Sequence, residues 1–284
     1  MDYKENEVED LERVYRDVNA EPIQIPYAVL KSITKNFTQV IGHGAFGVVY
    51  LGALRNENEL LVAVKKLFPL KDFSERQFLA EVGCLKKIKH NNTVRFLGYC
   101  ADTQGIVMEV EGKQRIGEIQ QRFICLEYVP NGSLDNYLEE KTHGYGWNTR
   151  YQIIKGICQG LHYLHQLRMY HLDLKPENVL LGAKMEPKIS DFGLSRCIDG
   201  DQFTIYTTHV QGTPGYIPPE HINDRKISLK SDIFSLGIIM TRLLIGSMDI
   251  IPENVRIYLT FLVAILHNSL MYSVFDTRNF YVAY

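Results

Sequence analysis

The segment at residues 171–178, HLDLKPEN, combines the residue types that proton transfer, phosphate binding and metal binding require. Asp173 can accept a proton from a hydroxyl group, and Lys175 can steady a transferring phosphoryl group. Asn178 can ligate a metal ion through its amide oxygen. Each of these residues by itself is also common in ordinary loops and turns, so the interpretation depends on what accompanies them.

A second carboxylate, Asp191, begins the segment Asp191-Phe192-Gly193 and lies thirteen residues after Asn178. Carboxylate and amide oxygens suit Mg²⁺, a hard cation that prefers oxygen ligands. Asn178 and Asp191 are therefore the predicted metal ligands. In this order and at this spacing, residues 171–193 indicate a phosphoryl-transfer site rather than a set of unrelated loop acids.

A glycine-rich segment at residues 42–49, GHGAFGVV, fits the pattern G-x-G-x-x-G-x-V. Glycines let backbone amides approach phosphate oxygens where a Cβ atom would collide. By itself such a string is as compatible with a plain turn as with a nucleotide loop. A dinucleotide-binding fold would need a helix directly after Gly47, whereas Val48-Val49-Tyr50 is strand-like. The sequence therefore excludes that fold and favours a hairpin lid.

A lysine inside an apolar strand, Lys65 in Val62-Ala63-Val64-Lys65, is the next candidate. A snorkelling or edge lysine would explain this tetrapeptide alone. Glu81 changes the balance, because the helix expected around it can aim its carboxylate toward Lys65. A buried ion pair seldom stabilises a fold much more than apolar packing does, so such a pair suggests a function.

The elements that must position these residues fall into two groups. The first 130 residues predict short strands with β-branched residues and one helix, residues 74–89, with a capping box at Ser74 and Gln77. The predicted strands cover residues 40–41, 48–50, 60–65, 93–100 and 123–128, with a long polar insert between the last two. Later residues predict two long helices, 147–167 and 231–245, separated by a loop-rich stretch.

These patterns predict an α+β fold with a small antiparallel β lobe and a larger, mainly helical lobe. Small-molecule sites favour the cleft between two such lobes. Acidic residues outnumber basic ones between Met1 and Glu21. This excess predicts a solvated or partly helical arm ahead of the domain, with an interaction tail as the alternative.

The composition indicates a soluble globular protein. Of its 284 residues 45% are hydrophobic and 23% are charged, which argues against disordered and fibrous classes. The net charge of −2 gives no reason to expect a nucleic-acid partner. The five cysteines include no C-x-x-C pair and are predicted to be free thiols in a reducing compartment. No stretch is long and apolar enough to predict a membrane span, so we expect a cytoplasmic protein.

Together the motifs resemble the eukaryotic protein kinases, from residue 37 to residue 246. Within that family the chain is most similar to plant receptor-like kinases, on three segments: SITKNF at 32–37, LGYC at 97–100 and EYVPNGSL at 127–134. The resemblance implies the following division: an acidic arm at 1–31, a kinase domain at 32–246 (N-lobe 32–126, hinge 127–132, C-lobe 133–246) and a divergent tail at 247–284.

The resemblance also implies roles for individual residues. Asp173 would be the catalytic base, assisted by Lys175, while Lys65, paired with Glu81, would hold the α- and β-phosphates of ATP. Asn178 and Asp191 would hold Mg²⁺. The implied ATP-binding residues are Ile41, Gly42, Gly44, Gly47, Val49, Ala63, Lys65, Leu126 as gatekeeper, Glu127 and Val129 through their backbones, and Leu180.

Other positions match parts of the family that support the site. His171 and Phe192 match a hydrophobic column that Asp232 anchors, together with Leu85 and Phe96. In Gly212-Thr213-Pro214-Gly215-Tyr216, Thr213 and Gly215 match the substrate-docking segment, and Thr213 is expected to bond Asp173 and Lys175. That segment and Lys175, two residues after the base, imply serine/threonine specificity.

The sequence departs from the family pattern at Leu172, where regulated kinases carry an arginine that receives an activation-loop phosphate. We therefore expect phosphorylation of Thr204, Thr207 or Thr208 to have little effect through this site. Glu220 follows two prolines, and no Arg-Pro motif that could supply its usual partner occurs after Gly246. Arg242 stands where relatives often have glutamate. If Glu220 is buried and unpaired, about 3–5 kcal/mol of stability would be lost.

Two functions follow as alternatives. The first is a protein serine/threonine kinase in receptor-like kinase signalling that uses ATP and Mg²⁺, acts on a protein substrate under an upstream receptor, and works in the cytoplasm or at the cytoplasmic face of the plasma membrane. The second is a nucleotide-binding pseudokinase, scaffold or decoy, which the incomplete C-lobe would favour.

Overall fold

The computed structural model describes residues 2–44, 46–54, 60–68, 75–110, 113–139, 146–198 and 204–245. The chain divides into two compact units. The first comprises residues 1–89 and 95–128, and the second comprises residues 90–94 and the chain from Val129 onward. The expected tail at 247–284, Gly246 and Ser74 of the expected capping box lie outside the described residues.

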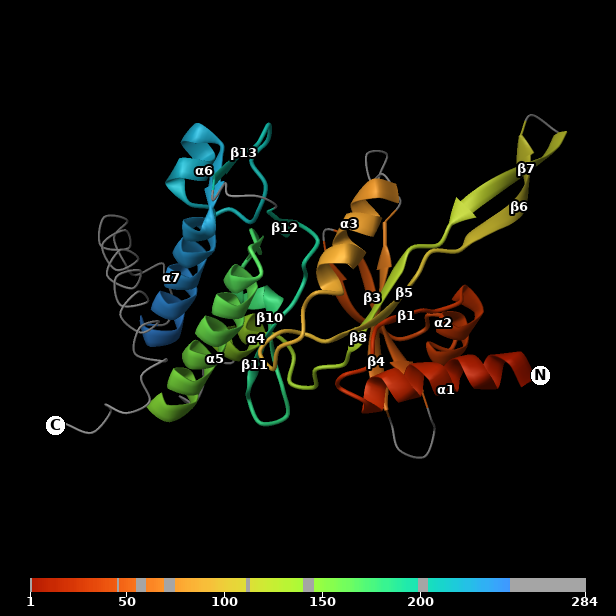
Figure 1. The fold of residues 1–284 in the computed structure, drawn as a ribbon, viewed down its shortest axis with the longest axis horizontal. Helices are drawn as coiled ribbons and strands as arrows, with labels where there is room; N and C mark the ends of the chain where they lie inside the picture. Colours follow the sequence, from red (N-terminus) through yellow and green to blue (C-terminus); the bar gives the residue numbers. More distant parts are fainter. Residues whose placement is uncertain are drawn as a thin grey trace. The chain divides into compact units, whose positions relative to one another are not determined.

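The first unit is built on a six-stranded sheet in the order β1-β5-β8-β4-β3-β2 (Figure 1). Only the short β1 runs parallel to its neighbour, and the other pairs are antiparallel, as the sequence predicted. The strands are β1 Ile23–Gln24, β2 Val40–Gly44, β3 Gly47–Ala53, β4 Leu61–Leu67, β5 Phe96–Cys100 and β8 Phe123–Glu127. The predicted helix is α3, Glu75–Leu85, which ends four residues before the predicted boundary.

The N-terminal segment, for which a solvated or partly helical arm was expected, is helical and packs into the core of this unit. It forms two helices, α1 at Asp2–Arg16 and α2 at Tyr27–Ile33. Leu11 and Val14 of α1 are fully buried in the core that also contains Val62 and Val64 of β4. Burial of such a side chain contributes about 1.5–3 kcal/mol each. The apolar residues of α1 recur at helical spacing, and acidic residues such as Glu9 and Asp10 occupy its exposed side.

The insert between β5 and β8 is an antiparallel hairpin of β6, Thr103–Val110, and β7, Lys113–Gln120. It forms a two-stranded sheet of its own and extends away from the six-stranded sheet (Figure 1). The sequence analysis identified this insert only as a long polar segment. The hairpin face that carries the cross-strand pair Val107 and Ile116 is not buried, because these side chains are 67% and 83% exposed. With that face exposed there was no alternation of apolar and polar residues to indicate strands.

The second unit is mainly helical, with short paired strands between its helices. The predicted long helices are α5, Trp147–Gln166, and α7, Leu229–Ile245, and each buries an apolar stripe. The other elements are α4 Leu134–Glu139, β9 Met169–Tyr170, the 3-10 turn η1 Pro176–Asn178, β10 Val179–Leu181, β11 Pro187–Ile189, β12 Arg196–Cys197, β13 Thr204–Tyr206, α6 Pro219–Asp224 and β14 Lys226–Ser228.

All five cysteines are free thiols, as predicted. Burial raises the pKa of the Cys125 thiol to about 12, so it stays protonated at neutral pH. None of the helices in the described ranges is long and apolar enough to cross a membrane.

Candidate active site

Asp173 lies at the centre of a hydrogen-bond network that sets the position of its carboxylate. The Thr213 hydroxyl donates to Asp173 Oδ1 at 2.6 Å, and Lys175 Nζ donates to Thr213 Oγ1 at 2.7 Å. Lys175 Nζ also lies 3.3 Å from Asp173 Oδ2. Asn178 Nδ2 donates to Asp173 Oδ2 at 3.1 Å and to the Asp173 carbonyl at 2.8 Å. The predicted bonds from Thr213 to both neighbours are therefore present.

The loop that carries Asp173 is anchored by Asp232, which lies in the first turn of α7. The Asp232 carboxylate accepts hydrogen bonds from the backbone N–H groups of His171 and Leu172, both at 2.8 Å, and lies 3.0 Å from His165 Nε2. Burial alone would raise the pKa of Asp232. The hydrogen bond and charge of His165, the charge of His171 and the hydrogen bond from the Leu172 N–H together lower it. Asp232 is thus an ionised, fully buried anchor, as expected.

His171 connects this anchor to Asp173 and to Phe192. Its Nδ1 accepts a hydrogen bond from the Asp173 N–H at 3.3 Å, so its Nε2 carries the proton and donates to the Ser190 carbonyl at 2.9 Å. The His171 and Phe192 rings meet edge to face with their centroids 5.3 Å apart. Both side chains are buried, and this part of the expected hydrophobic column is present.

Asn178 and Asp191 lie at the same end of the β10–β11 hairpin. Val179 pairs with Ile189, so the residues just outside the hairpin, Asn178 and Ser190, face each other. The Ser190 N–H and hydroxyl both donate to the Asn178 carbonyl, at 2.8 Å and 3.0 Å. Asp191 follows directly. Asn178 and Asp191 are thirteen residues apart in sequence, and the β10–β11 hairpin brings them to the same end of that hairpin.

The residues at this end of the hairpin fit a hard cation. The Asn178 amide nitrogen points to Asp173, which leaves the amide oxygen as the atom available for a metal ion. Asp191 adds a carboxylate, so the available donors are oxygens, as Mg²⁺ prefers. Asp191 and Leu172 both have left-handed backbone conformations, with φ of 61° and 66°. Such strain costs about 1–3 kcal/mol per residue and is typical of functional sites.

The docking segment is a tight turn that α7 holds at two points. Gly215 has a φ of 89°, and the Tyr216 N–H donates to the Thr213 carbonyl at 3.0 Å, as in a type II turn with Pro-Gly at its centre. Ser235 Oγ donates to the Tyr216 carbonyl at 2.8 Å, and Arg242 donates to the Tyr216 hydroxyl at 2.8 Å.

Arg242 and Ser235 are supporting residues that the sequence analysis missed. Arg242 also donates to Asp135 of α4 at 3.1 Å, so this arginine ties the docking segment to α4 and α7. The sequence showed only that Arg242 was unusual for the family. Nothing in the sequence could have paired it with Tyr216 and Asp135, because the three residues come from distant parts of the chain.

Leu172 belongs to a small apolar cluster instead of a phosphate-binding site. It packs with Tyr170, Ile198 and Ile227, all of them buried. Ile227 lies in β14, which pairs with β13, the strand that begins at Thr204. Ile198 and the strand that begins at Thr204 are therefore held by apolar packing and strand pairing.

Glu220 does not meet the condition of burial that the sequence analysis set for a loss of stability. Glu220 lies in the first turn of α6 and is partly exposed, so the cost of a buried unpaired charge does not apply. Acidic residues also suit this position, because the N-terminal end of a helix attracts negative charge. Pro218 precedes the helix and Pro219 opens it, where a missing N–H is tolerated.

The first unit gathers the other predicted residues on one face of its sheet. The pairings Val49 with Lys65 and Ala63 with Leu126 put these four side chains on the same face, since paired residues of antiparallel strands share a face. Val62 and Val64 point to the opposite face, into the core. Lys65 is 7% exposed and its Nζ lies 5.7 Å from the centre of the Phe46 ring. Glu81 of α3 is also buried, at 8% exposure.

The predicted glycine loop is the turn between β2 and β3. Gly42 pairs with Val49 and Gly44 with Gly47, which confirms the hairpin that the sequence indicated. Gly47 is required by packing, because a Cβ atom there would lie 2.1 Å from the Lys66 carbonyl oxygen. A Cβ atom at Gly42 or Gly44 would meet no protein atom closer than 3.7 Å, so a ligand could approach the backbone at these two glycines. Ile41 lies at a bulge in β2 and is 38% exposed.

The remaining predicted nucleotide contacts come from both units. Glu127 ends β8 in the first unit, whereas Val129 and Leu180 belong to the second unit. The Glu127 N–H already donates to the Arg95 carbonyl at 3.0 Å. The sequence analysis expected Glu127 to bind the nucleotide through its backbone. Because the N–H is already bonded, only the Glu127 carbonyl is suited to that contact.

Comparison with known proteins agrees with this geometry. Residues 36–260 match the family described as "Protein kinase domain". The chain belongs to the protein kinase family. Over 231 residues it is 38% identical to putative cysteine-rich receptor-like protein kinase 16 of Arabidopsis thaliana, covering 79% of this chain and 32% of that protein. It is 39% identical over 227 residues to the G-type lectin S-receptor-like serine/threonine-protein kinase SD1-13 of the same plant, covering 78% of this chain and 25% of that protein.

The kinase domain thus spans about a quarter to a third of the length of these curated relatives. A third relative, cysteine-rich receptor-like protein kinase 10 of Arabidopsis thaliana, is 38% identical over 234 residues, 80% of this chain and 32% of its own. The similarity confirms the kinase fold that the motifs predicted. It gives no support to the pseudokinase alternative.

Proposed function

We propose that this kinase domain transfers the γ-phosphoryl group of ATP to serine or threonine hydroxyls of a protein substrate. The observation that carries the proposal is the network around Asp173, in which Thr213, Lys175 and Asn178 all bond one carboxylate or its immediate partner. A carboxylate that is fixed in this way, 7% exposed and bonded to the docking segment through Thr213, is suited to accept the proton of an incoming hydroxyl.

In the proposed reaction Asp173 accepts the proton of the attacking hydroxyl, and Lys175 places a positive charge beside the oxygens that gain charge during transfer. Lys65, on the face of its sheet opposite the core, orients the phosphates. Thr213 keeps the Asp173 carboxylate in one orientation while the docking turn holds the peptide backbone. Mg²⁺, held by the Asn178 amide oxygen and by Asp191, would neutralise phosphate charge.

Serine/threonine specificity is supported by the bond between Lys175 and Thr213. Lys175 Nζ lies 3.3 Å from Asp173 Oδ2, and a lysine two residues after the base, bonded to this docking segment, is the arrangement that implied serine/threonine specificity in the sequence. The relatives include proteins named serine/threonine-protein kinases. By the same relationship we propose a role in receptor-like kinase signalling, under an upstream receptor at the cytoplasmic face of the plasma membrane.

Phosphoryl transfer to matched peptides tests this function. Three peptides that differ only in their acceptor, serine, threonine or tyrosine, are incubated with the protein, γ-labelled ATP and Mg²⁺. We expect label on the serine and threonine peptides alone, and loss of transfer when EDTA removes the metal. Transfer to the tyrosine peptide at a comparable rate would contradict the specificity, and absence of transfer to all three would contradict the function.

A further inference from the structure

Arg95 closes the C-terminal end of helix α1. Its Nη1 donates to the Tyr15 carbonyl at 3.0 Å, and its Nη2 donates to the carbonyls of Val14 and Asp17. The last carbonyls of a helix have no partners within the helix, and a cation at that end is favoured by the helix dipole. A planar guanidinium can satisfy several of these carbonyls together, so this contact fixes where α1 ends.

The same arginine is bonded through its backbone to the end of β8. The Arg95 N–H donates to Glu127 Oε1 at 2.8 Å, and the Glu127 N–H donates to the Arg95 carbonyl at 3.0 Å. Glu127 pairs with Val62 in the sheet, so its side chain lies on the core face, the face that α1 covers. Burial raises the pKa of Tyr15, and the charge of Glu127 adds to that increase while the charge of Arg95 opposes it.

Two further contacts fix α1 independently of Arg95. Leu11 and Val14 are buried in the core of the unit. The segment after the helix is held by Lys89, whose Nζ donates to Glu21 Oε1 at 2.6 Å and to the Asn19 carbonyl at 3.4 Å. The helix is therefore a rigid support, and Arg95 is the residue that joins it to Glu127.

We propose that α1 is a built-in clamp on the nucleotide-binding end of β8, and that Arg95 is the positioning residue through which it acts. The proposal rests on the proposed function, in which the Glu127 backbone contacts the nucleotide. With α1 holding the Arg95 side chain, the Arg95 backbone holds the amide and the carboxylate of Glu127. The Glu127 carbonyl then points in one direction before the nucleotide binds.

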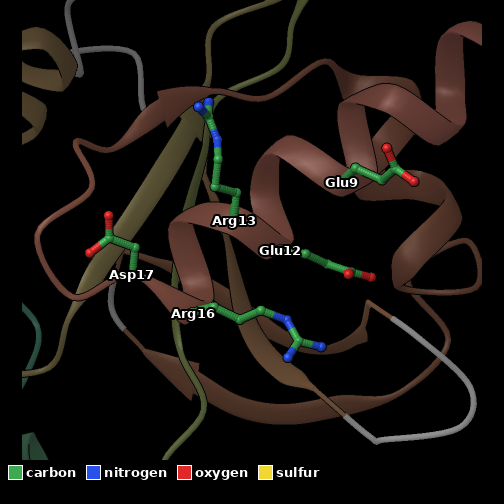
Figure 2. Close-up of a pocket in the computed structure, with 5 residues that line it drawn as sticks. All are labelled: Glu9, Glu12, Arg13, Arg16 and Asp17. Carbon is green, nitrogen blue, oxygen red and sulfur yellow. The ribbon is translucent and has the colours of Figure 1, made fainter.

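The basic residues on the exposed side of α1 provide a matched control. Arg13 and Arg16 extend from the C-terminal half of the helix and, with Glu9, Glu12 and Asp17, line a charged cavity of about 460 Å³ (Figure 2). Arg16 belongs to the last turn of the same helix but is exposed. Arg16→Met removes a charge from this turn and leaves the Arg95 contacts in place.

Steady-state kinetics of the full chain test the clamp. Arg95→Met keeps the backbone bonds to Glu127 and removes the three side-chain bonds to α1. We expect the KM for ATP to rise about three- to tenfold, the range that the loss of one or two hydrogen bonds produces. We expect the KM for a serine peptide and kcat to change less than about twofold. Arg95→Lys keeps the positive charge but not the forked geometry of the guanidinium. Its KM for ATP should therefore lie between the values of the wild-type protein and Arg95→Met.

The outcomes separate the clamp from the proposed function. An active wild-type protein with an unchanged KM for ATP in Arg95→Met, or equal increases in the KM for ATP and for peptide, would overturn the clamp alone. A wild-type protein without transfer would overturn both proposals. If Arg95→Met does not fold, Arg95→Lys and Arg16→Met decide: the clamp requires a higher KM for ATP in Arg95→Lys only.

Discussion

At the scale of single residues, the site depends on how few orientations are left to one carboxylate. The Thr213 hydroxyl bonds the charged groups of both Asp173 and Lys175, donating to the carboxylate and accepting from the ammonium. The distances of 2.6 Å and 2.7 Å are those of charge-assisted bonds, which are stronger than neutral ones. Removal of this hydroxyl should therefore affect the chemical step more than the fold.

Thr213→Val removes the hydroxyl and keeps the shape of the side chain. Because each lost charge-assisted bond is worth about 1.5–3 kcal/mol, we expect kcat to fall about 10- to 100-fold. The measurement is kcat with ATP and peptide both at saturation. Thr213→Ser retains the hydroxyl and is the control, with kcat within about threefold of wild type. A Thr213→Val enzyme as fast as Thr213→Ser would show that this hydroxyl does not support Asp173.

At the scale of elements, the described parts of the segment between Asp191 and α6, residues 191–198 and 204–218, are held by strand pairing and apolar contacts. β13 pairs with β14 over three residues, and Leu172 is buried with Tyr170, Ile198 and Ile227. Thr207 is further fixed by its N–H, which donates to the Arg225 carbonyl at 2.9 Å. A phosphate is thus not needed to order this segment, and Leu172 could not receive one.

We therefore predict that activity is nearly independent of phosphorylation at Thr204, Thr207 and Thr208. Phosphatase-treated protein and single alanine variants at these positions should retain kcat within a few-fold of the phosphorylated protein. Peptide phosphorylation, with the phosphate content of each sample checked by mass spectrometry, makes the comparison. A tenfold or greater dependence on the phosphate would contradict the prediction.

At the scale of the whole molecule, the N-terminal segment is part of the first unit, joined to it by buried side chains, by Arg95 and by Lys89. The catalytic half of the site was predictable from the sequence, because the spacing from Asp173 to Asp191 follows from a loop and the short β10–β11 hairpin. The packing of α1 against the core could not be predicted, because the many acidic residues around Leu11 and Val14 made their helical spacing hard to recognise. Nor could the contacts of Arg95 and Arg242 be predicted, because they join residues far apart in sequence.

Leu11→Asp tests whether the N-terminal helix belongs to the core. Leu11 is fully buried, so an aspartate there would place an unpaired charge among apolar side chains. We expect the free energy of unfolding to fall by about 3 kcal/mol or more, measured by urea denaturation. Val18→Asp, just after the helix at a position 69% exposed, is the matched control and should change it by less than about 0.5 kcal/mol. Equal effects of the two substitutions would mean that α1 is not part of the core.

The most direct measurement of the central claim is phosphoryl transfer to a serine peptide by wild-type protein, Asp173→Asn and Asp224→Asn. Asp224 is an exposed acid at the end of α6 and controls for loss of charge. The asparagine at 173 keeps the size of the carboxylate but cannot accept a proton, so we predict a loss of kcat of about 100-fold or more, with an unchanged thermal unfolding midpoint. Asp224→Asn should match the wild-type protein. Retention of wild-type kcat by Asp173→Asn would contradict the account, because the carboxylate on which the site is built would then have no part in the reaction.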